Sequence, residues 1–450
     1  MKTRKSIYLA ALAALALTAC SNDDNEIFDQ SAADRLEQYK KDYADVLTAD
    51  GGLWTMEYFS NAEEPGYVFV MKFDKNGSVQ ISANHKWIDG EFKQETSLWK
   101  MIADNGPVLS FNSYNKLFHI FSDPANIVGP DAPSGEEGDI NETGYGHEGD
   151  YEFQVMEVSE DGKTVRLLGK KRLIDIFLHR LDTSVDVQEY LEDVKDIPNR
   201  FSTRFNDLTM TDVDGNLYRV YDFGTGIPSI YPLAGDAVSQ TVSANGIFTL
   251  DGFRFMKPLE VKRADDSTFE IENLYFNSEG AMNGDNVEDL RATSPLENLI
   301  RADLTWTLDP ESLSGKVKSL YDAANDALVS ALTSKDTLGA IDFTYASVAG
   351  KIVPQLVTRI GTRICRDYIE YDVQTDANDN VVSSDQLHFS ITGGNNTALK
   401  YDKEIPAYKA FKDYLTGYFL MTVSDPMCPE VIILTDKNDN SSSCSFKVKK

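Results

Sequence analysis

The spacing of apolar positions changes its period early in the chain. Between residues 31 and 47 apolar side chains fall on one helical stripe, at Leu36, Tyr39, Tyr43, Val46 and Leu47. Ser31 and Asp34 form a start that resembles a capping box. After Gly51-Gly52 apolar and polar residues alternate one by one. The pattern therefore predicts a helix over 31–47 that is followed by β-strands.

Short alternating segments dominate residues 53–181. They include YVFVMKF at 67–73, YEFQV at 151–155 and IDIFL at 174–178, and turn signals such as DKNG and EDGK separate them. The pattern predicts about nine strands in this region. Many short antiparallel strands joined by tight turns favour a closed or nearly closed barrel, because closure removes exposed sheet edges. We therefore expect a lipocalin-like barrel behind the first helix.

Helix and strand patterns recur further along the chain. A short helix is expected at 184–194, and strand patterns then run to about residue 276, with a hairpin around Asp214-Gly215. Asp309-Pro310 resembles an N-cap and first turn, and a long apolar stripe follows it to Leu332. Strand patterns then return, with a short helix near 406–415. The expected fold class is α+β, mainly antiparallel β, with lipocalin-like barrel modules that are each preceded by a helix.

These changes of pattern divide the chain into segments. We predict a signal peptide over 1–19, an acidic tether over 20–30, a helix-plus-barrel domain over 31–182, a middle β-rich segment over 183–294 and a C-terminal helix-plus-β domain over 295–450. A single domain over 183–450 is the alternative. The segments 149–171 and 416–438 share one layout, which fits either duplication or generic patterning of two unrelated β modules. Residues 123–150, rich in Gly, Pro and acid, are either a functional or a disordered loop.

The chain begins with an export signal. Three basic residues among the first five precede an uncharged, mostly apolar run over 7–18, which is about half the length of a membrane-spanning helix. Leu17, Thr18 and Ala19 then lead into Cys20, and this resembles the lipobox of bacterial lipoproteins, in which the cysteine becomes the acylated N-terminus. An ordinary secretory signal with a chance cysteine is the alternative. Acyl chains such as palmitate on Cys20 would hold the protein to a membrane.

The residues after Cys20 are strongly polar. Ser21, Asn22, Asp23 and Asp24 resemble the acidic export tag that sends Bacteroidetes lipoproteins to the cell surface, although a solvated linker has the same composition. We expect a lipid-anchored protein on the outer membrane that faces the outside. No further run of 18 apolar residues follows the signal.

Charge narrows the range of partners. The 43 basic and 72 acidic residues give a net charge of −29, and removal of residues 1–19, which hold three basic groups and no acidic ones, gives 40 − 72 = −32. Such a field repels phosphate backbones and anionic head groups. Nucleic acid is therefore excluded as a partner, and membrane contact is expected through the lipid alone. The 42% of hydrophobic residues suffices for two or three buried cores.

Cysteine and histidine give few signals of chemistry. Cys428 and Cys444 flank a strand and a polar turn, so they form either a disulfide or two buried thiols, and Cys365 is expected to be a buried thiol. The five histidines do not occur at metal-ligand spacing; they are His85, His119, His147, His179 and His388. We interpret His119 and His179 as strand residues. Only His147, in the long loop, has a plausible functional setting, and we expect no metal and no cofactor.

Several other motifs have simpler explanations. The segments at 211–216, 375–380 and 435–440 resemble calcium loops, but the last two, read from Asp376 and Asp436, lack the required Gly and Glu. Asn, Asp and Gly are also what hairpin turns need. The 23 Phe and 21 Tyr would suit a sugar-stacking platform, and Trp87, Trp99 and Tyr145 are the side chains to check for exposure, although barrel core is the expected role. A nucleophile elbow, a P-loop and a CxxC motif are absent from the sequence.

The N-terminal third resembles a known family. The stretches GGLWTMEYFSN (51–61), GYVFVMKFDKNGSV (66–79), SLWKMIADNGPVLSFNSYNKLFHIFSDP (97–124) and GDYEFQVMEVSEDGKTVRLLGKK (149–171) are similar to a family of uncharacterised Bacteroidetes outer-membrane lipoproteins, a domain family of unknown function. The resemblance covers residues 20–280. It implies that the gene for this protein lies near genes for TonB-dependent transporters and their surface lipoproteins. The family has no assigned catalytic residues.

We therefore expect a non-enzymatic accessory or ligand-binding component of a nutrient-uptake system. A surface hydrolase that acts on glycans or peptides is one alternative, because 72 acidic residues allow any number of carboxylate pairs. A structural or adhesive surface protein is the other. The expected partners are the outer membrane, a TonB-dependent transporter and that transporter's surface lipoprotein.

Overall fold

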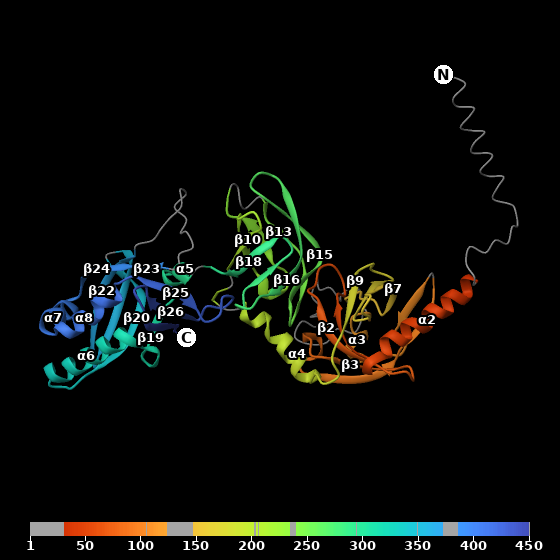
Figure 1. Ribbon diagram of the computed structural model, residues 1–450, viewed down its shortest axis with the longest axis horizontal. Helices are drawn as coiled ribbons and strands as arrows, with labels where there is room; N and C mark the ends of the chain where they lie inside the picture. The colour runs from red at the N-terminus through yellow and green to blue at the C-terminus, as the bar shows by residue number, and fades with distance from the viewer. Residues whose placement is uncertain are drawn as a thin grey trace, which may run out of the picture.

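The computed structural model describes residues 31–104, 106–123, 147–201, 204–205, 207–234, 240–293, 295–348, 350–371 and 386–449. These residues form three nine-stranded antiparallel sheets, each built from one continuous stretch of the chain. We call the three units the N-terminal, middle and C-terminal barrels. They lie in a row, with the middle barrel between the other two (Figure 1).

Each barrel is built from nine successive strands of the chain. The N-terminal barrel contains β1 (Leu53–Tyr58), β2 (Tyr67–Phe73), β3 (Ser78–Ala83), β4 (Lys93–Leu98), β5 (Lys100–Ala103), β6 (Pro107–Ser110), β7 (Glu152–Val158), β8 (Thr164–Gly169) and β9 (Asp175–Arg180). The middle barrel contains β10 (Leu208–Asp212), β11 (Leu217–Tyr221), β12 (Ser229–Pro232), β13 (Val242–Ser243), β14 (Gly246–Thr249), β15 (Gly252–Lys262), β16 (Thr268–Phe276), β17 (Met282–Gly284) and β18 (Val287–Ala292). The C-terminal barrel contains β19 (Trp306–Asp309), β20 (Leu338–Val348), β21 (Lys351–Ile360), β22 (Arg363–Tyr371), β23 (Gln386–Leu387), β24 (Phe389–Gly394), β25 (Phe419–Val423), β26 (Val431–Asp436) and β27 (Asp439–Val448).

Helices accompany each sheet. The α-helices are α2 (Ala32–Thr48), α3 (Lys116–His119), α4 (Val187–Asp196), α5 (Pro295–Leu299), α6 (Gly315–Ala331), α7 (Asn396–Glu404) and α8 (Pro406–Leu415). Short 3-10 turns are η2 (Ala49–Gly51), η3 (Lys86–Ile88), η4 (Pro198–Arg200), η5 (Phe223–Thr225) and η7 (Pro310–Ser312). Helices α2, α4 and α5 precede the first strands of the three barrels. The described residues contain no helix that is long and apolar enough to cross a membrane.

Each sheet curls until its two edge strands meet. The edges of the N-terminal sheet are β4 and β5, which only Trp99 separates in the chain. The middle sheet has β13 and β14 at its edges, two residues apart, and the C-terminal sheet has β23 and β24, with only His388 between them. Because one residue spans less than about 4 Å, the two edges of each sheet must lie side by side. The expected α+β fold with barrel-like modules is confirmed.

In all three barrels the strands next to the first strand are the same ones in sequence order. The first strand pairs with both the second and the last, so β1 lies between β2 and β9, β10 between β11 and β18, and β19 between β20 and β27. The segments 149–171 and 416–438, which share one sequence layout, hold the same pair of strands in this order, β7–β8 and β25–β26. The middle barrel is a third unit of this topology, and its hairpins had given no comparable sequence signal.

Two local expectations were wrong. Asp309 does act as a cap, but of the 3-10 turn η7, and α6 begins only at Gly315, between the first two strands of its barrel. His119 lies in α3 rather than in a strand, because Asn115 caps a helical turn there by accepting a hydrogen bond from the Leu117 N–H. The first helix is as expected: the Ser31 hydroxyl accepts from the Asp34 N–H at 3.1 Å.

Aromatic side chains fill the N-terminal barrel. Helix α3 places Phe118 inside it, 5.1 Å from the ring of Tyr58 and 5.4 Å from that of Phe69. Phe111, Phe121 and Phe153 complete the cluster, and all six side chains are fully buried. Trp87 and Trp99 are also buried, as expected for core residues. The lumen is thus a packed core, and space for a ligand has to be sought outside it.

Candidate functional site

One partly enclosed cavity lies between the N-terminal and middle barrels. It has a volume of about 480 Å³, which is within the range of small-molecule sites, and junctions between domains are common places for such sites. Strands β1 and β9 line it from one barrel, β15 and β16 from the other, and α4 closes one side. We call it the junction cavity.

Strand β1 is buried on both of its faces, which is unusual for a barrel wall. Trp54, Met56 and Tyr58 point into the aromatic core, and the alternate positions face the middle barrel and α4. The two barrels are further joined by a backbone bond from the Gly66 N–H to the Gly246 carbonyl, at 2.9 Å. A charged residue on the outer face of β1 is therefore forced into the junction.

That charged residue is Glu57. Its Oε2 accepts a hydrogen bond from Arg254 Nε of β15 at 2.6 Å, and its Oε1 lies 3.3 Å from His179 Nε2 of β9. The Glu57 and Arg254 side chains are only 9% and 11% exposed. Burial raises the pKa of Glu57, but the hydrogen bonds and charges of His179 and Arg254 outweigh it, so the net pKa is lowered and the carboxylate stays ionised.

Aromatic rings complete the wall of the junction cavity. The Arg254 guanidinium lies over the Phe177 ring at 4.5 Å, and Phe177 stacks in parallel with His179. Tyr190 projects from α4, and burial together with the nearby acids Asp251 and Glu57 raises its pKa to about 12. Arg254 Nη2 is buried and has no hydrogen-bond partner within the described part of the chain. The cavity thus combines a buried guanidinium with a flat aromatic surface.

The polar groups of the junction cavity suit binding better than catalysis. Thr164 Oγ1 lies 3.3 Å from His179 Nδ1, so that hydroxyl, imidazole and carboxylate follow one another as they do in serine hydrolases. However, both contacts are long, and Glu57 makes its short contact with Arg254 instead. The strongest interactions here fix a guanidinium and a carboxylate in place, as in a recognition site.

A second, more open cavity of about 630 Å³ lies between the middle and C-terminal barrels. Tyr221 and Tyr231 line one part of it, with ring centroids 5.9 Å apart. Arg301 also lines it, but its guanidinium already pairs with Asp303 at 2.7 Å. Arg301 is thus neutralised by a neighbouring carboxylate, as Arg254 is in the junction cavity.

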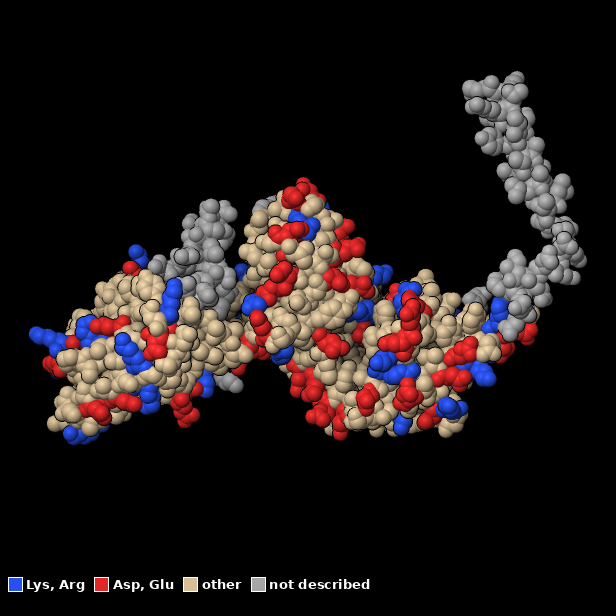
Figure 2. All heavy atoms as spheres, in the orientation of Figure 1, with Lys and Arg blue, Asp and Glu red and all other residues tan. Residues whose placement is uncertain are grey.

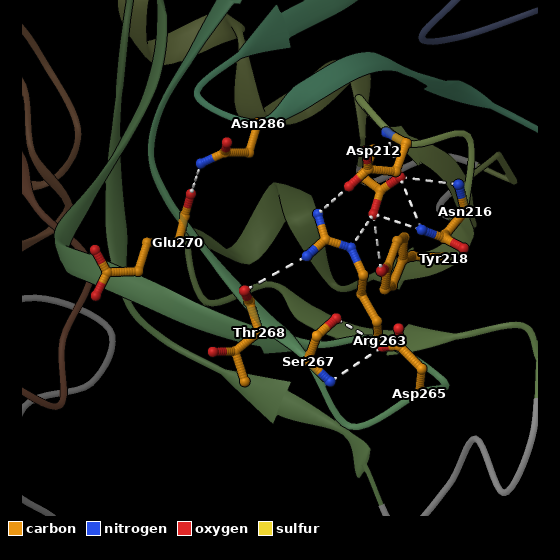
Figure 3. Close-up of polar contacts among 10 residues, drawn as sticks. Asp212, Asn216, Tyr218, Arg263, Asp265, Ser267, Thr268, Glu270 and Asn286 are labelled. Carbon is orange, nitrogen blue, oxygen red and sulfur yellow. Dashed lines mark hydrogen bonds and ion pairs between the residues drawn. The ribbon is translucent and has the colours of Figure 1, made fainter.

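The calcium-like segment at 211–216 is a hairpin turn. Figure 3 shows the Asp212 carboxylate at its centre, with Asn216, Tyr218 and Arg263 pointing toward it. Arg263 Nε donates at 2.9 Å, and the backbone N–H groups of Asp214 and Asn216 donate at 3.0 and 2.8 Å. The carboxylate oxygens are fully engaged by donors and by a cation, which leaves no place for Ca²⁺.

Other metal signals are equally weak. Residues 435–440 form the β26–β27 turn, and residues 375–380 lie outside the described residues. Throughout the residues that the structure describes, no group of three or more His, Cys, Asp or Glu could hold a metal ion.

His147, which the sequence singled out, is fully buried beside the aromatic core. Its Nδ1 lies 2.6 Å from Glu64 Oε1, and its ring packs against Trp87 with centroids 4.2 Å apart. Glu64 also accepts from the Tyr67 hydroxyl at 2.9 Å. Burial raises the pKa of Glu64, but the hydrogen bonds and charge of its partners lower it by more. The net pKa of Glu64 is therefore lowered. His147 therefore has a structural role, because it contacts both Glu64 and Trp87 inside the N-terminal barrel.

The three cysteines that the structure describes are free thiols. Cys365 and Cys444 are buried thiols, and burial raises their pKa to about 11 and about 12. Cys444 faces Leu434 in the middle of the β26–β27 hairpin. Cys428 lies outside this hairpin, before β26 begins at Val431. The hairpin therefore separates the two sulfur atoms, and the Cys428–Cys444 disulfide is not formed. The buried-thiol expectation for Cys365 is confirmed.

The remaining sequence-derived site residues lie outside the described residues. They are Leu17, Thr18, Ala19, Cys20, Ser21, Asn22, Asp23, Asp24 and Tyr145. Glu57 and Arg254 were missed by the sequence analysis. One signal was present, because Glu57 interrupts the otherwise mostly apolar strand LWTMEY.

The chain belongs to a family of unknown function. The model of the domain of unknown function DUF4302 matches residues 24–273, which is more than half of the 450-residue chain and agrees with the region of resemblance described above. No curated protein matches the chain.

Two solved structures of DNA polymerase clamps align along most of the chain. The beta subunit of DNA polymerase from Streptococcus pyogenes is 11% identical and aligns over 91% of this chain and 97% of its own, with a TM-score of 0.12. The DnaN sliding clamp from Bartonella birtlesii is 10% identical over 88% and 91%, with a TM-score of 0.10. Scores this low carry no argument about fold or function.

Proposed function

We propose that this protein is a lipid-anchored, non-enzymatic accessory protein on the outer face of the outer membrane, where it binds a ligand for a nutrient-uptake system. The lipobox-like Leu17-Thr18-Ala19-Cys20 and the acidic residues after it support the address. The resemblance to outer-membrane lipoproteins of unknown function supports the context, in which a TonB-dependent transporter and its surface lipoprotein are the partners.

The junction cavity is the observation that carries the binding role. It combines an ionised carboxylate, a guanidinium and an aromatic face in a space of about 480 Å³. Pockets with a few fixed polar groups and apolar walls are typical of small-molecule recognition.

A surface hydrolase is the second candidate, and the alignment of Thr164, His179 and Glu57 is what favours it. An adhesive role has less support. Large exposed apolar side chains are scattered over the three barrels, for example Leu173, Val213 and Ile352. Charged residues are likewise spread over all three barrels on the face that Figure 2 shows, rather than gathered in one patch.

The Cys20→Ala variant tests the lipid anchor and the membrane location. We expect the variant to lose palmitate labelling and to leave the membrane fraction, with Cys428→Ala as the control that keeps both. A Cys20→Ala protein that still incorporates palmitate and still sediments with membranes would overturn the lipid anchor.

The binding role is tested with glycan and peptide arrays and three variants. Tyr275→Ala removes a half-exposed wall of the junction cavity, and we expect it to weaken binding of any captured ligand at least tenfold. Tyr114→Ala is the control. Tyr114 is a similarly exposed tyrosine of the N-terminal barrel that does not line the junction cavity. Cleavage of an array component that His179→Ala abolishes would favour the hydrolase instead.

A further inference from the structure

Lys412 of the C-terminal barrel is a buried lysine between two carboxylates. It lies on α8 with its side chain 1% exposed. Its Nζ is 2.6 Å from Asp367 Oδ1 of β22 and 2.7 Å from Asp402 Oδ1 of α7. Lysine is almost never fully buried unless it is paired. Three separate elements therefore converge on one amine in a dry site.

The two carboxylates differ in their surroundings. Asp367 is 1% exposed and Asp402 is 21% exposed, so only Asp402 reaches toward solvent. Burial raises the pKa of Asp367 more than the Lys412 charge lowers it, so this carboxyl takes up a proton more readily than an exposed aspartate does. Asp367 Oδ2 is buried and has no hydrogen-bond partner among the residues described. An ionised carboxylate would leave that oxygen strongly unsatisfied.

Apolar and aromatic groups exclude water from the cluster. The Tyr408 ring lies 4.9 Å from Lys412 Nζ, and Cys365 and Phe411 are buried beside Asp367 and Lys412 in the chain. A buried ion pair gains little when its ions are taken out of water. The same dry contact places the Lys412 amine directly beside the Asp367 carboxyl group, with Nζ 2.6 Å from Oδ1, so that little movement is needed to bring the two groups together.

We propose that Lys412 and Asp367 are joined by an intramolecular isopeptide bond. Lys412 first gives a proton to Asp367, which leaves a neutral amine beside a neutral carboxyl. The amine Nζ then attacks Cγ of Asp367, a new Nζ–Cγ bond forms, and the bond from Cγ to the protonated oxygen, Oδ1, breaks.

The proton balance closes without any co-reactant. Asp402 accepts a proton from the attacking nitrogen and passes it to the departing hydroxide, so that Oδ1 leaves as one water molecule. Ammonium and carboxylate have become amide and water, nothing is oxidised or reduced, and Asp402 returns to its starting state. Oδ2, which lacks a partner among the residues described, remains as the uncharged carbonyl oxygen of the new amide.

The same helix supplies a matched control. Lys409 and Asp413 of α8 also form an ion pair, with Nζ 2.8 Å from Oδ1, but their side chains are about half exposed. Water solvates both charges there, so we expect no bond. Equal proximity with unequal burial isolates desolvation as the cause.

Peptide mapping of the denatured full-length protein is the test. Trypsin should release segments 367–400 and 410–437 as a single branched species that is lighter than their sum by one water molecule, with no cleavage after Lys412. Asp402→Asn keeps both reacting groups but removes the proton carrier, and we expect the two segments to separate. Asp413→Asn should leave the branched species intact.

The wild-type digest decides the proposal even if a variant fails to fold. Recovery of 367–400 as a linear peptide, together with cleavage after Lys412, would overturn it. A further check is Asp367→Asn, in which attack on the side-chain amide expels ammonia and should give a branched species of the same mass as the wild-type one.

Discussion

Removal of the Arg254 guanidinium should uncouple the N-terminal and middle barrels. Arg254 Nε lies 2.6 Å from Glu57 Oε2, and both side chains are about nine-tenths buried. Arg254→Met keeps much of the side-chain volume but leaves an ionised carboxylate in the junction, with only His179 at 3.3 Å as a partner. Breaking a buried pair from one side costs about 3–5 kcal/mol.

The double variant separates loss of the pair from the penalty for an unpaired charge. Glu57→Gln/Arg254→Met removes both charges, so we expect it to regain most of the loss and to end within about 1–2 kcal/mol of the wild type. Part of the remainder is the contact between the guanidinium and the Phe177 ring, worth about 0.5–2 kcal/mol.

Urea unfolding followed by tryptophan fluorescence can measure this. Three of the four tryptophans, Trp54, Trp87 and Trp99, are buried in the N-terminal barrel, and Trp306 is buried in the C-terminal one. A Trp306→Phe background therefore limits the signal to the N-terminal barrel. An Arg254→Met midpoint within error of the wild type, or a double variant as unstable as the single one, would refute the coupling.

The Glu57–Arg254 pair also makes the folding stability fall at acid pH. Because the folded-state pKa of Glu57 is lowered, its stabilising contribution is complete above the unfolded pKa of about 4.3 and is lost as the pH falls through the lower folded value. The difference in unfolding free energy between wild type and Glu57→Gln should therefore be constant from pH 6 to about 5 and shrink below about pH 4. A difference that disappears near neutral pH would contradict this assignment.

Three further predictions concern single sites. Asp212→Ala leaves Arg263 without its buried partner and should destabilise the middle barrel by about 3 kcal/mol in urea unfolding, and no loss would contradict the role of this carboxylate. Gly52→Ala should cost more than about 1 kcal/mol in the same assay, because Gly52 has a φ of +66° and a Cβ there would meet a β2 carbonyl at 2.2 Å. Cys365 and Cys444, with pKa values raised to about 11 and 12, should resist iodoacetamide at pH 8 until the chain unfolds, and mass spectrometry of the alkylated peptides would reveal native-state labelling.

Local features of the fold were readable in the sequence because they depend on near neighbours. Ser31 and Asp34 marked the first helix, and alternation with turn signals located the nine strands of the N-terminal barrel. The middle barrel was harder to recognise as a barrel, because β13 has only two residues and a register shift interrupts the pairing of β15 with β16. Short or shifted strands weaken the alternation on which the prediction rests.

Contacts between distant residues could not be read from the pattern. Glu57 and Arg254 are 197 residues apart in the chain and meet only because the N-terminal and middle barrels pack side by side. Lys412, Asp367 and Asp402 come from two helices and a strand, and each alone is an ordinary charged residue. Burial of such groups depends on the tertiary packing, which no local spacing encodes.

The measurement that tests the account most directly is a pull-down of the natively lipidated protein, tagged at its C-terminus, from its own outer membranes, followed by mass spectrometry. We predict stoichiometric recovery of a TonB-dependent transporter, reduced when the Cys20→Ala variant is used as bait. Recovery of the lipidated protein alone, from membranes in which the transporter is detected, would contradict the accessory role.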